Sequence, residues 1–300
     1  MTDFAQARVI TAIKTPYLPD RSIDLEAFDR LVERQIEAGV QGLIIGGTTG
    51  EGHLMGWDEH VMLIAHSVNQ FGDRLLIVGN TGSNNTKEVV KATEHGFAVG
   101  MDAALLINPY YGKTNVRGMT AHLKAGLDIG PAIVYNVPGR TGQDIPSEVI
   151  EALAGHENLL GVKECVGPER IAHYRSLGIG CWSGNDDDCH QSRHQSGAYG
   201  VISVTSNLLP KTMLRLMEQP DEALNQRLGK LFAWLFQEPN PIALNTVSAM
   251  LGLCLPVFRL PYVPLTKEQR AAGLLVLQEL ADLGELPEAK LLEDEDYSWL

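Results

Sequence analysis

The sequence predicts an α/β fold, a (β/α)8 TIM barrel with a C-terminal helical appendage, and three observations support it. Eight short β-rich runs alternate with helical stretches over residues 1–222, and only helical stretches follow. A doubly wound open sheet would give a similar alternation. However, no G-x-G-x-x-G motif follows the first run and the chain has no P-loop, which disfavours that alternative. We therefore expect a catalytic barrel over residues 1–222 and a helical domain over residues 223–300.

The β-rich runs have the character of buried parallel strands. They are apolar on both faces and recur at intervals of roughly 20 to 35 residues, as parallel strands do when crossover helices cover them. They span residues 8–13, 42–46, 75–78, 103–107, 132–135, 159–162, 180–183 and 200–204.

The segments between the runs carry helix start and stop signals. Asp24 is placed to cap a helix whose apolar residues follow the 3.6-residue period, and Gly39 is placed to end it. Asn240-Pro241 begins a later helix, because proline is favoured at an early helical position. Further helices are expected over residues 57–68, 86–99, 222–236, 240–251 and 266–284.

Composition restricts the classes of ligand. Acidic residues outnumber basic ones, 37 to 24, for a net charge of −13. A nucleic-acid-binding surface needs clustered Lys and Arg, so we expect small-molecule ligands and no nucleic-acid partner. No apolar run approaches the roughly 18 residues of a membrane span, so no membrane association is expected. The acidic run over residues 293–296 is interpreted as a solvated tail.

The cysteines indicate a reduced, intracellular protein. Four cysteines in so long a chain, without paired short spacing, predict neither a disulfide framework nor a zinc ribbon. They are Cys165, Cys181, Cys189 and Cys254.

In a barrel of this type the active site lies at the carboxyl ends of the strands, and two lysines end apolar runs there. They are Lys14 and Lys163. Burial penalises an ammonium and lowers its pKa, and a neutral amine can attack a ketone to form an imine that acts as an electron sink. Position alone does not choose between the two lysines, and a structural salt bridge is the alternative role for either.

Other polar side chains end neighbouring runs. Tyr135 and Tyr111 could relay protons with the Thr49 hydroxyl, and Arg140 could pair with a carboxylate. A tyrosine more often packs in the core, but several on one rim with a lysine favour a site. The run over residues 186–190 contains metal-ligand side chains, yet consecutive residues point in different directions, so we interpret it as an acidic helix N-terminus and expect no metal site. The glycine-rich stretch over residues 46–50 lacks the lysine of a phosphate loop.

These motifs together resemble the dihydrodipicolinate synthase and N-acetylneuraminate lyase superfamily, most closely its plant-type 4-hydroxy-tetrahydrodipicolinate synthases. The resemblance covers nearly the whole chain. The matching segments are TAIKTP from Thr11, GGTTGEG from Gly46, NPYYGK from Asn108, YNVPGRTG from Tyr135, GVKEC from Gly161, WSGND from Trp182, GVISVT from Gly200 and FRLPYVPL from Phe258. One departure is Gly139, where plant-type sequences often have serine.

The resemblance implies roles for these residues and favours Lys163 over Lys14. It implies that Lys163 forms a Schiff base with pyruvate, that no cofactor is needed beyond this imine, and that the product is 4-hydroxy-tetrahydrodipicolinate, an intermediate of lysine biosynthesis through diaminopimelate. It implies a proton relay of Tyr135, Thr49 and Tyr111. The residues implied to bind pyruvate and L-aspartate 4-semialdehyde are Thr48, Arg140, Gly184 and Ile202.

The resemblance also implies regulation and assembly. A lysine feedback site is expected from His53, Trp57, His60, Asn84, Glu88 and Tyr110, although Trp57 and His60 could merely pack a helix face. Tyr111 is expected to cross a subunit interface, in a homotetramer built as a dimer of dimers. The expected compartment is the cytoplasm, with the plastid stroma as the alternative.

Two other functions stay open at this point. Another pyruvate-dependent class I aldolase, acting on N-acetylneuraminate or a 2-keto-3-deoxy sugar acid, would share the imine and differ in the aldehyde. A lysine sensor could keep the barrel and lack catalysis, which the intact set of candidate catalytic residues disfavours.

Overall fold

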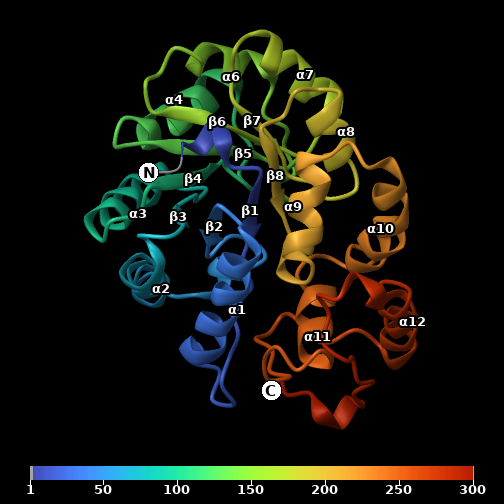
Figure 1. Ribbon diagram of the computed structural model, residues 1–300. Coiled ribbons are helices and arrows are strands. Elements are labelled where there is room, and N and C mark those ends of the chain that lie inside the picture. Colours follow the sequence, from blue (N-terminus) through green and yellow to red (C-terminus); the bar gives the residue numbers. More distant parts are fainter. Residues whose placement is uncertain (1–2, 300) are drawn as a thin grey trace.

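Eight parallel strands close into a barrel in chain order, with β8 pairing back to β1 (Figure 1). The structure is a computed structural model and describes residues 3–299. The strands are β1 (Val9–Ala12), β2 (Gly42–Ile45), β3 (Leu76–Asn80), β4 (Ala103–Ile107), β5 (Ala132–Asn136), β6 (Leu159–Glu164), β7 (Cys181–Ser183) and β8 (Gly200–Ser203). The fold class and the position of every predicted strand are confirmed.

A ring of helices surrounds the barrel, one or two after each strand. Asp24 caps α1 through a hydrogen bond from the Ala27 amide, and Gly39 ends that helix at φ 85° in the left-handed region, so both predicted signals are confirmed. The helices are α1 (Leu25–Ala38), α2 (Trp57–Phe71), α3 (Thr86–Ala98), α4 (Val116–Leu127), α5 (Pro138–Thr141), α6 (Ser147–Leu153), α7 (Pro168–Ser176), α8 (Cys189–His194) and α9 (Pro210–Glu218).

Three helices follow the ring and lie beside the barrel (Figure 1). They are α10 (Glu222–Leu235), α11 (Ile242–Met250) and α12 (Lys267–Gln278). α12 ends before the predicted residue 284, and a 3₁₀ turn over Ala281–Leu283 precedes Gly284, which has φ 72°. One apolar cluster joins α9, α10 and α11 to Val9 and Val201 of the barrel. The appendage and the barrel therefore share part of one core.

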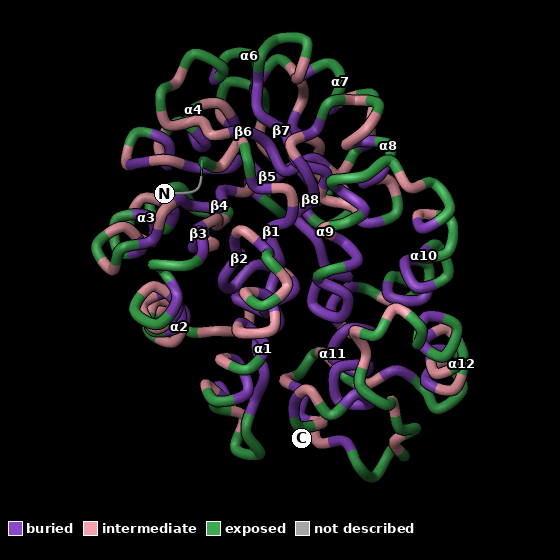
Figure 2. Tube along the Cα trace, in the orientation of Figure 1, coloured by how far each residue is buried: buried purple, intermediate pink, exposed green. Residues whose placement is uncertain are grey.

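The strands at the centre of the molecule are buried (Figure 2), and side chains fill the barrel interior. Ile10, Ile44, Leu105 and Ile133 pack inside it. Trp182 lies fully buried in the same cluster, and its indole Nε1 donates to the Ala7 carbonyl at 3.0 Å. The amino-terminal end of the barrel is thus closed, which leaves the opposite end for a site.

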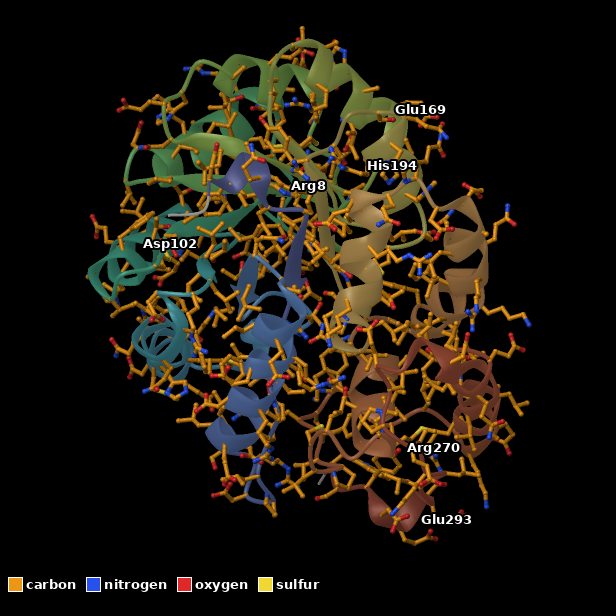
Figure 3. All side chains as sticks on the ribbon, in the orientation of Figure 1. Arg8, Asp102, Glu169, His194, Arg270 and Glu293 are labelled. Carbon is orange, nitrogen blue, oxygen red and sulfur yellow. The ribbon has the colours of Figure 1, made fainter. Side chains whose placement is uncertain are left out.

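The acidic run near the C-terminus is exposed to solvent, as composition predicted, and one of its residues also pairs with a buried arginine. Arg270 is fully buried, and its guanidinium donates to the Asp294 carboxylate at 2.6 Å and to the Leu265 carbonyl. A buried cation needs such partners, so Asp294, whose side chain is 67 % exposed, pairs from the surface with a cation inside the appendage. Figure 3 labels Arg270 and Glu293, which both lie in this region.

The acidic stretch before α8 differs in part from its interpretation. Asp188 lies at the helix N-cap, as expected, but makes no capping bond with its side chain. Asp186 instead turns inward, is 2 % exposed and accepts from the amides of Val204 and Thr205. Within residues 3–299 no cluster of side chains suits a metal ion, and all four cysteines are free. No helix in that range is long and apolar enough to cross a membrane.

Candidate active site and adjoining pocket

A cavity of about 530 Å³ opens at the carboxyl end of the strands. Its walls come from the ends of β2, β5, β6 and β7, and from the segment 236–240 between α10 and α11. The lining includes Lys163, Tyr135, Thr48, Thr49, Arg140 and Gly184. Six of the eight predicted catalytic and substrate-binding residues therefore meet in one hollow.

Lys163 extends from β6 toward the ring of Tyr135 on β5. The two residues are register partners in neighbouring strands, and Nζ lies 4.3 Å from the ring centroid. Burial lowers the pKa of Lys163, and the positive charge of Arg140 lowers it further. The neutral amine is therefore more populated than in an exposed lysine, as a nucleophile requires.

Lys14 is placed differently, although it also ends a strand. It is 2 % exposed and does not line the cavity. Its ammonium donates to the Asn245 amide oxygen at 2.8 Å. The structure thus places Lys163, and not Lys14, where a small molecule can enter.

The tyrosine and threonines of the site lie together. Tyr135 is 7 % exposed, and burial raises the pKa of its phenol well above the usual range. The phenol therefore keeps its proton at neutral pH and is able to donate it. The Thr49 hydroxyl accepts from the Asn240 amide at 3.0 Å. Thr48 lines the same cavity, and its hydrogen bond with Tyr135 opposes part of the rise in the pKa that burial causes.

Gly184 and Arg140 shape two parts of the cavity. A Cβ on Gly184 would lie 2.4 Å from Sγ of Cys165 and 3.1 Å from Cγ of Lys163, so only glycine leaves room for these side chains. Arg140, on α5, is exposed at the mouth and donates to the Asn240 carbonyl at 2.9 Å. Its guanidinium has further donors for a carboxylate.

Two predicted residues lie outside the cavity. Ile202 is fully buried in the barrel interior, and Val204, which follows the end of β8, lines the cavity instead. Tyr111 is 96 % exposed and has φ 64°, a backbone conformation that a non-glycine residue seldom adopts. Tyr111 lines neither of the two cavities at this end of the barrel.

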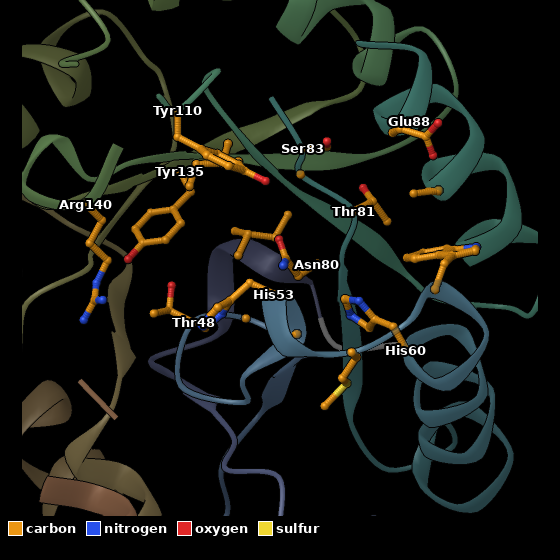
Figure 4. A pocket seen from close by; sticks show the side chains of 18 of the residues that line it. Thr48, His53, His60, Asn80, Thr81, Ser83, Glu88, Tyr110, Tyr135 and Arg140 are labelled. Carbon is orange, nitrogen blue, oxygen red and sulfur yellow. The ribbon is translucent and has the colours of Figure 1, made fainter. Parts of the chain in front are cut away.

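A second cavity, of about 510 Å³, adjoins the first (Figure 4). Five of the six predicted lysine-site residues line it, namely His53, Trp57, His60, Glu88 and Tyr110. Asn84 does not line it, but its amide donates to the Tyr110 carbonyl at 3.3 Å. Thr48, Tyr135 and Arg140 line both cavities, so a ligand in one would lie next to side chains of the other.

The second cavity has a distinct polar character at each end. Burial lowers the pKa values of His53 and His60, which favours neutral imidazoles. Figure 4 shows Glu88 across the hollow from Arg140. A ligand with one cationic and one anionic group would find opposite charges there.

A family model described as the dihydrodipicolinate synthetase family matches residues 5–279. The chain belongs to this family. The 4-hydroxy-tetrahydrodipicolinate synthase of Zea mays, named as chloroplastic, is 58 % identical in an alignment 299 residues long that covers 98 % of this chain and 78 % of that protein. The chain is therefore an enzyme of a synthase family, and its plant-type character is confirmed.

Solved structures of dihydrodipicolinate synthases are similar over most of the chain. The chloride-inhibited enzyme of Acinetobacter baumannii, complexed with pyruvate, is 34 % identical with a TM-score of 0.87 over 93 % of this chain and 99 % of that one. The enzyme of Cyanidioschyzon merolae with lysine bound is 29 % identical with a TM-score of 0.86 over 94 % and 99 %.

Three residues of this family member at the two cavities were not predicted. Asn240, from the appendage, contacts both Thr49 and Arg140, yet the sequence indicated only a helix start there. Cys165 lines the first cavity beside Lys163. Tyr262 lines the second, and its hydroxyl lies 2.9 Å from Nε2 of His53. A polar side chain beside Pro241 or Pro261 was the available signal, and it is weak.

Proposed function

We propose that the chain condenses pyruvate with L-aspartate 4-semialdehyde through a Schiff base on Lys163, which gives 4-hydroxy-tetrahydrodipicolinate for lysine biosynthesis. One observation carries this proposal: a buried amine with a lowered pKa opens into a cavity whose mouth carries Arg140. Family membership supports the choice of substrates.

The chemistry follows from the amine. Neutral Lys163 adds to C2 of pyruvate, and loss of water gives an imine. The protonated imine withdraws electrons from C3, which loses a proton and becomes a nucleophilic enamine. C3 then bonds to the aldehyde carbon, whose oxygen takes a proton. The amino group of the second substrate attacks C2, closes the ring and displaces Lys163 as the free amine. The imine is the electron sink throughout, so the reaction requires no cofactor and no metal.

The remaining side chains have roles that fit their positions. Thr48 holds the carboxylate of the pyruvate imine, while Gly184 leaves space for Lys163. Arg140 receives the carboxylate of the aldehyde substrate. Tyr135 and Thr49 move protons to and from the reacting oxygens, and Tyr111 completes this relay in the site of a neighbouring subunit. Its 96 % exposure supports that role, which requires a dimer, within the proposed homotetramer.

We further propose that free lysine inhibits the enzyme from the second cavity. Glu88 would pair with an ammonium group, and His53, Trp57, His60, Asn84 and Tyr110 would surround the rest of the ligand. Thr48, Tyr135 and Arg140 line both cavities, so a bound lysine would lie next to residues of the active site and could displace them. Because the plant relative is named as chloroplastic, the plastid stroma is the compartment that we propose, in preference to the cytoplasm.

Borohydride trapping tests the proposal. Pyruvate followed by borohydride should add one reduced pyruvyl group to the tryptic peptide that contains Lys163, and Lys163→Met should abolish the adduct. Turnover with aspartate semialdehyde, and not with N-acetylneuraminate or 2-keto-3-deoxy sugar acids, would separate the synthase from other pyruvate aldolases. An adduct without turnover of any of these, together with tight lysine binding, would instead support a sensor.

A further inference from the structure

The second buried lysine of the barrel, Lys14, has no part in the chemistry above. Lys14 is 2 % exposed, and its ammonium lies among polar groups of the protein rather than in a cavity. Nζ donates to the Asn245 amide oxygen at 2.8 Å and to the Thr15 carbonyl at 3.4 Å. A buried charge is costly unless it is paired, so these contacts must serve to keep it there.

Asn245 links the Lys14 ammonium to a buried carboxylate. Its amide nitrogen donates to Oε1 of Glu51 at 2.7 Å, and Glu51 is fully buried. An ammonium can only donate and a carboxylate can only accept, whereas an amide does both. Lys14 therefore fixes the orientation of the Asn245 amide, with the oxygen toward the lysine and the nitrogen toward Glu51.

Glu51 belongs to the loop that carries Thr48 and Thr49. Its backbone has φ 59°, in the left-handed region that non-glycine residues seldom adopt. Such a conformation persists only where the surroundings hold it. The bond from Asn245 holds the side chain of Glu51, and the Thr15 hydroxyl donates to the preceding Gly50 carbonyl at 2.7 Å.

The charges at the two ends of this chain depend on each other. Burial raises the pKa of Glu51, and the largest opposing influence is the positive charge of Lys14. If Lys14 were neutral, the Glu51 carboxylate would more readily take up a proton. The Asn245 amide would then be free to turn, and the loop would lose its fixed attachment to α11.

We propose that Lys14, Asn245 and Glu51 form a positioning relay, which holds the loop so that the Thr49 hydroxyl keeps its place in the active-site cavity. The three residues come from the end of β1, from α11 and from the loop after β2, so the relay joins the appendage to the catalytic rim. The inference rests on the proposed role of Thr49 in proton transfer.

The test compares Lys14→Met with a matched loss of a buried cation elsewhere. Lys14→Met should lower kcat by about 10- to 100-fold, because misplacement of a catalytic group by about 1 Å has effects of that size. The KM for aspartate semialdehyde should change by less than about 2-fold, since Arg140, which is proposed to bind it, lies on α5 and outside the loop. Arg270→Met also removes a fully buried cation, but one that contacts no residue of the loop, and it should lower the melting temperature while kcat stays within about 2-fold.

A double variant separates positioning from general stability. In a Thr49→Val background, Lys14→Met should reduce kcat no further, because residues that act through one group are not additive. An additive loss, or an unchanged kcat in Lys14→Met alone, would overturn the relay. If Lys14→Met does not fold, Glu51→Gln replaces it, with the same expected non-additivity.

Borohydride trapping keeps this proposal distinct from the proposed function. The relay predicts that Lys14→Met still forms the pyruvyl adduct on Lys163. An adduct with an unaffected kcat refutes the relay alone, whereas the absence of an adduct in the wild-type enzyme refutes the proposed function on which it rests.

Discussion

Gly184→Ala should impair catalysis without unfolding the protein. The added Cβ would lie 2.4 Å from Sγ of Cys165, and 3.1 and 3.2 Å from Cγ and Cε of Lys163. Non-bonded carbon contacts are favourable at about 3.5 to 4.0 Å, so Cys165 must move by about 1 Å and Lys163 by several tenths. Both side chains line the cavity, and the displacement falls on the reacting amine.

The magnitude follows from this displacement. A shift of about 1 Å in a catalytic group costs about 100-fold in rate, or about 2.7 kcal/mol of transition-state stabilisation. Overpacking costs about 1 to 3 kcal/mol of the free energy of unfolding, which a barrel of this size can lose and remain folded. Removal of the sulfur in Gly184→Ala/Cys165→Ala leaves only the two contacts of 3.1 and 3.2 Å, and kcat should return to within about 10-fold of wild type.

A coupled assay of steady-state kcat and a thermal melt would measure both effects. Gly229→Ala is the matched control, because a Cβ there meets nothing within 4 Å. It should leave kcat unchanged and raise the free energy of unfolding by about 0.5 to 1 kcal/mol, as glycine replacement in a helix does. A Gly184→Ala enzyme with kcat within about 2-fold of wild type would refute the assignment of the Lys163 amine, which lies against Gly184, as the reacting group.

Three further predictions concern charge. Arg140→Met should raise the KM for aspartate semialdehyde by about 10- to 100-fold in steady-state kinetics, since a charge-assisted hydrogen bond is lost, while pyruvate still forms the adduct on Lys163; equal effects on the KM of both substrates would contradict it. Glu88→Gln should weaken lysine binding about 10- to 100-fold in calorimetry with kcat retained, and an unchanged dissociation constant would exclude Glu88 from the site. Burial raises the pKa of Glu164 to about 7, so the folded protein holds this proton over a range in which the unfolded chain has released it. Wild-type stability should therefore fall by up to about 3 kcal/mol as pH rises from about 4.5 to 7, and Glu164→Gln should lack this slope in denaturant unfolding; parallel pH profiles would refute it.

The fold could be predicted because its signals are local. Apolar runs mark strands, and Asp24 and Gly39 mark the ends of a helix through backbone geometry that a few neighbouring residues determine. Closure of the sheet was an inference from the number of alternations. The exposure of the acidic run followed from composition, but the ion pair of Asp294 with Arg270 did not, because the two residues are 24 positions apart along the chain.

The site could be predicted only in part, since strand-end position treats Lys14 and Lys163 alike. What separates them is Asn245, which is 231 residues away from Lys14. Its amide oxygen accepts a hydrogen bond from the Lys14 ammonium, whereas the Lys163 amine faces the cavity. Asn240 and Tyr262 were missed for the same reason, because they reach the cavities from the appendage. Tyr111 shows a further limit: the role proposed for it depends on a neighbouring subunit, and one chain displays only its 96 % exposure.

The measurement that tests the central claim most directly is a crystal structure of the enzyme soaked with pyruvate. We predict continuous electron density from Nζ of Lys163 to C2 of the three-carbon acid, with the carboxylate of that acid against Thr48. Density that ends at an unmodified Lys163, or a pyruvyl group attached to Lys14, would contradict the account.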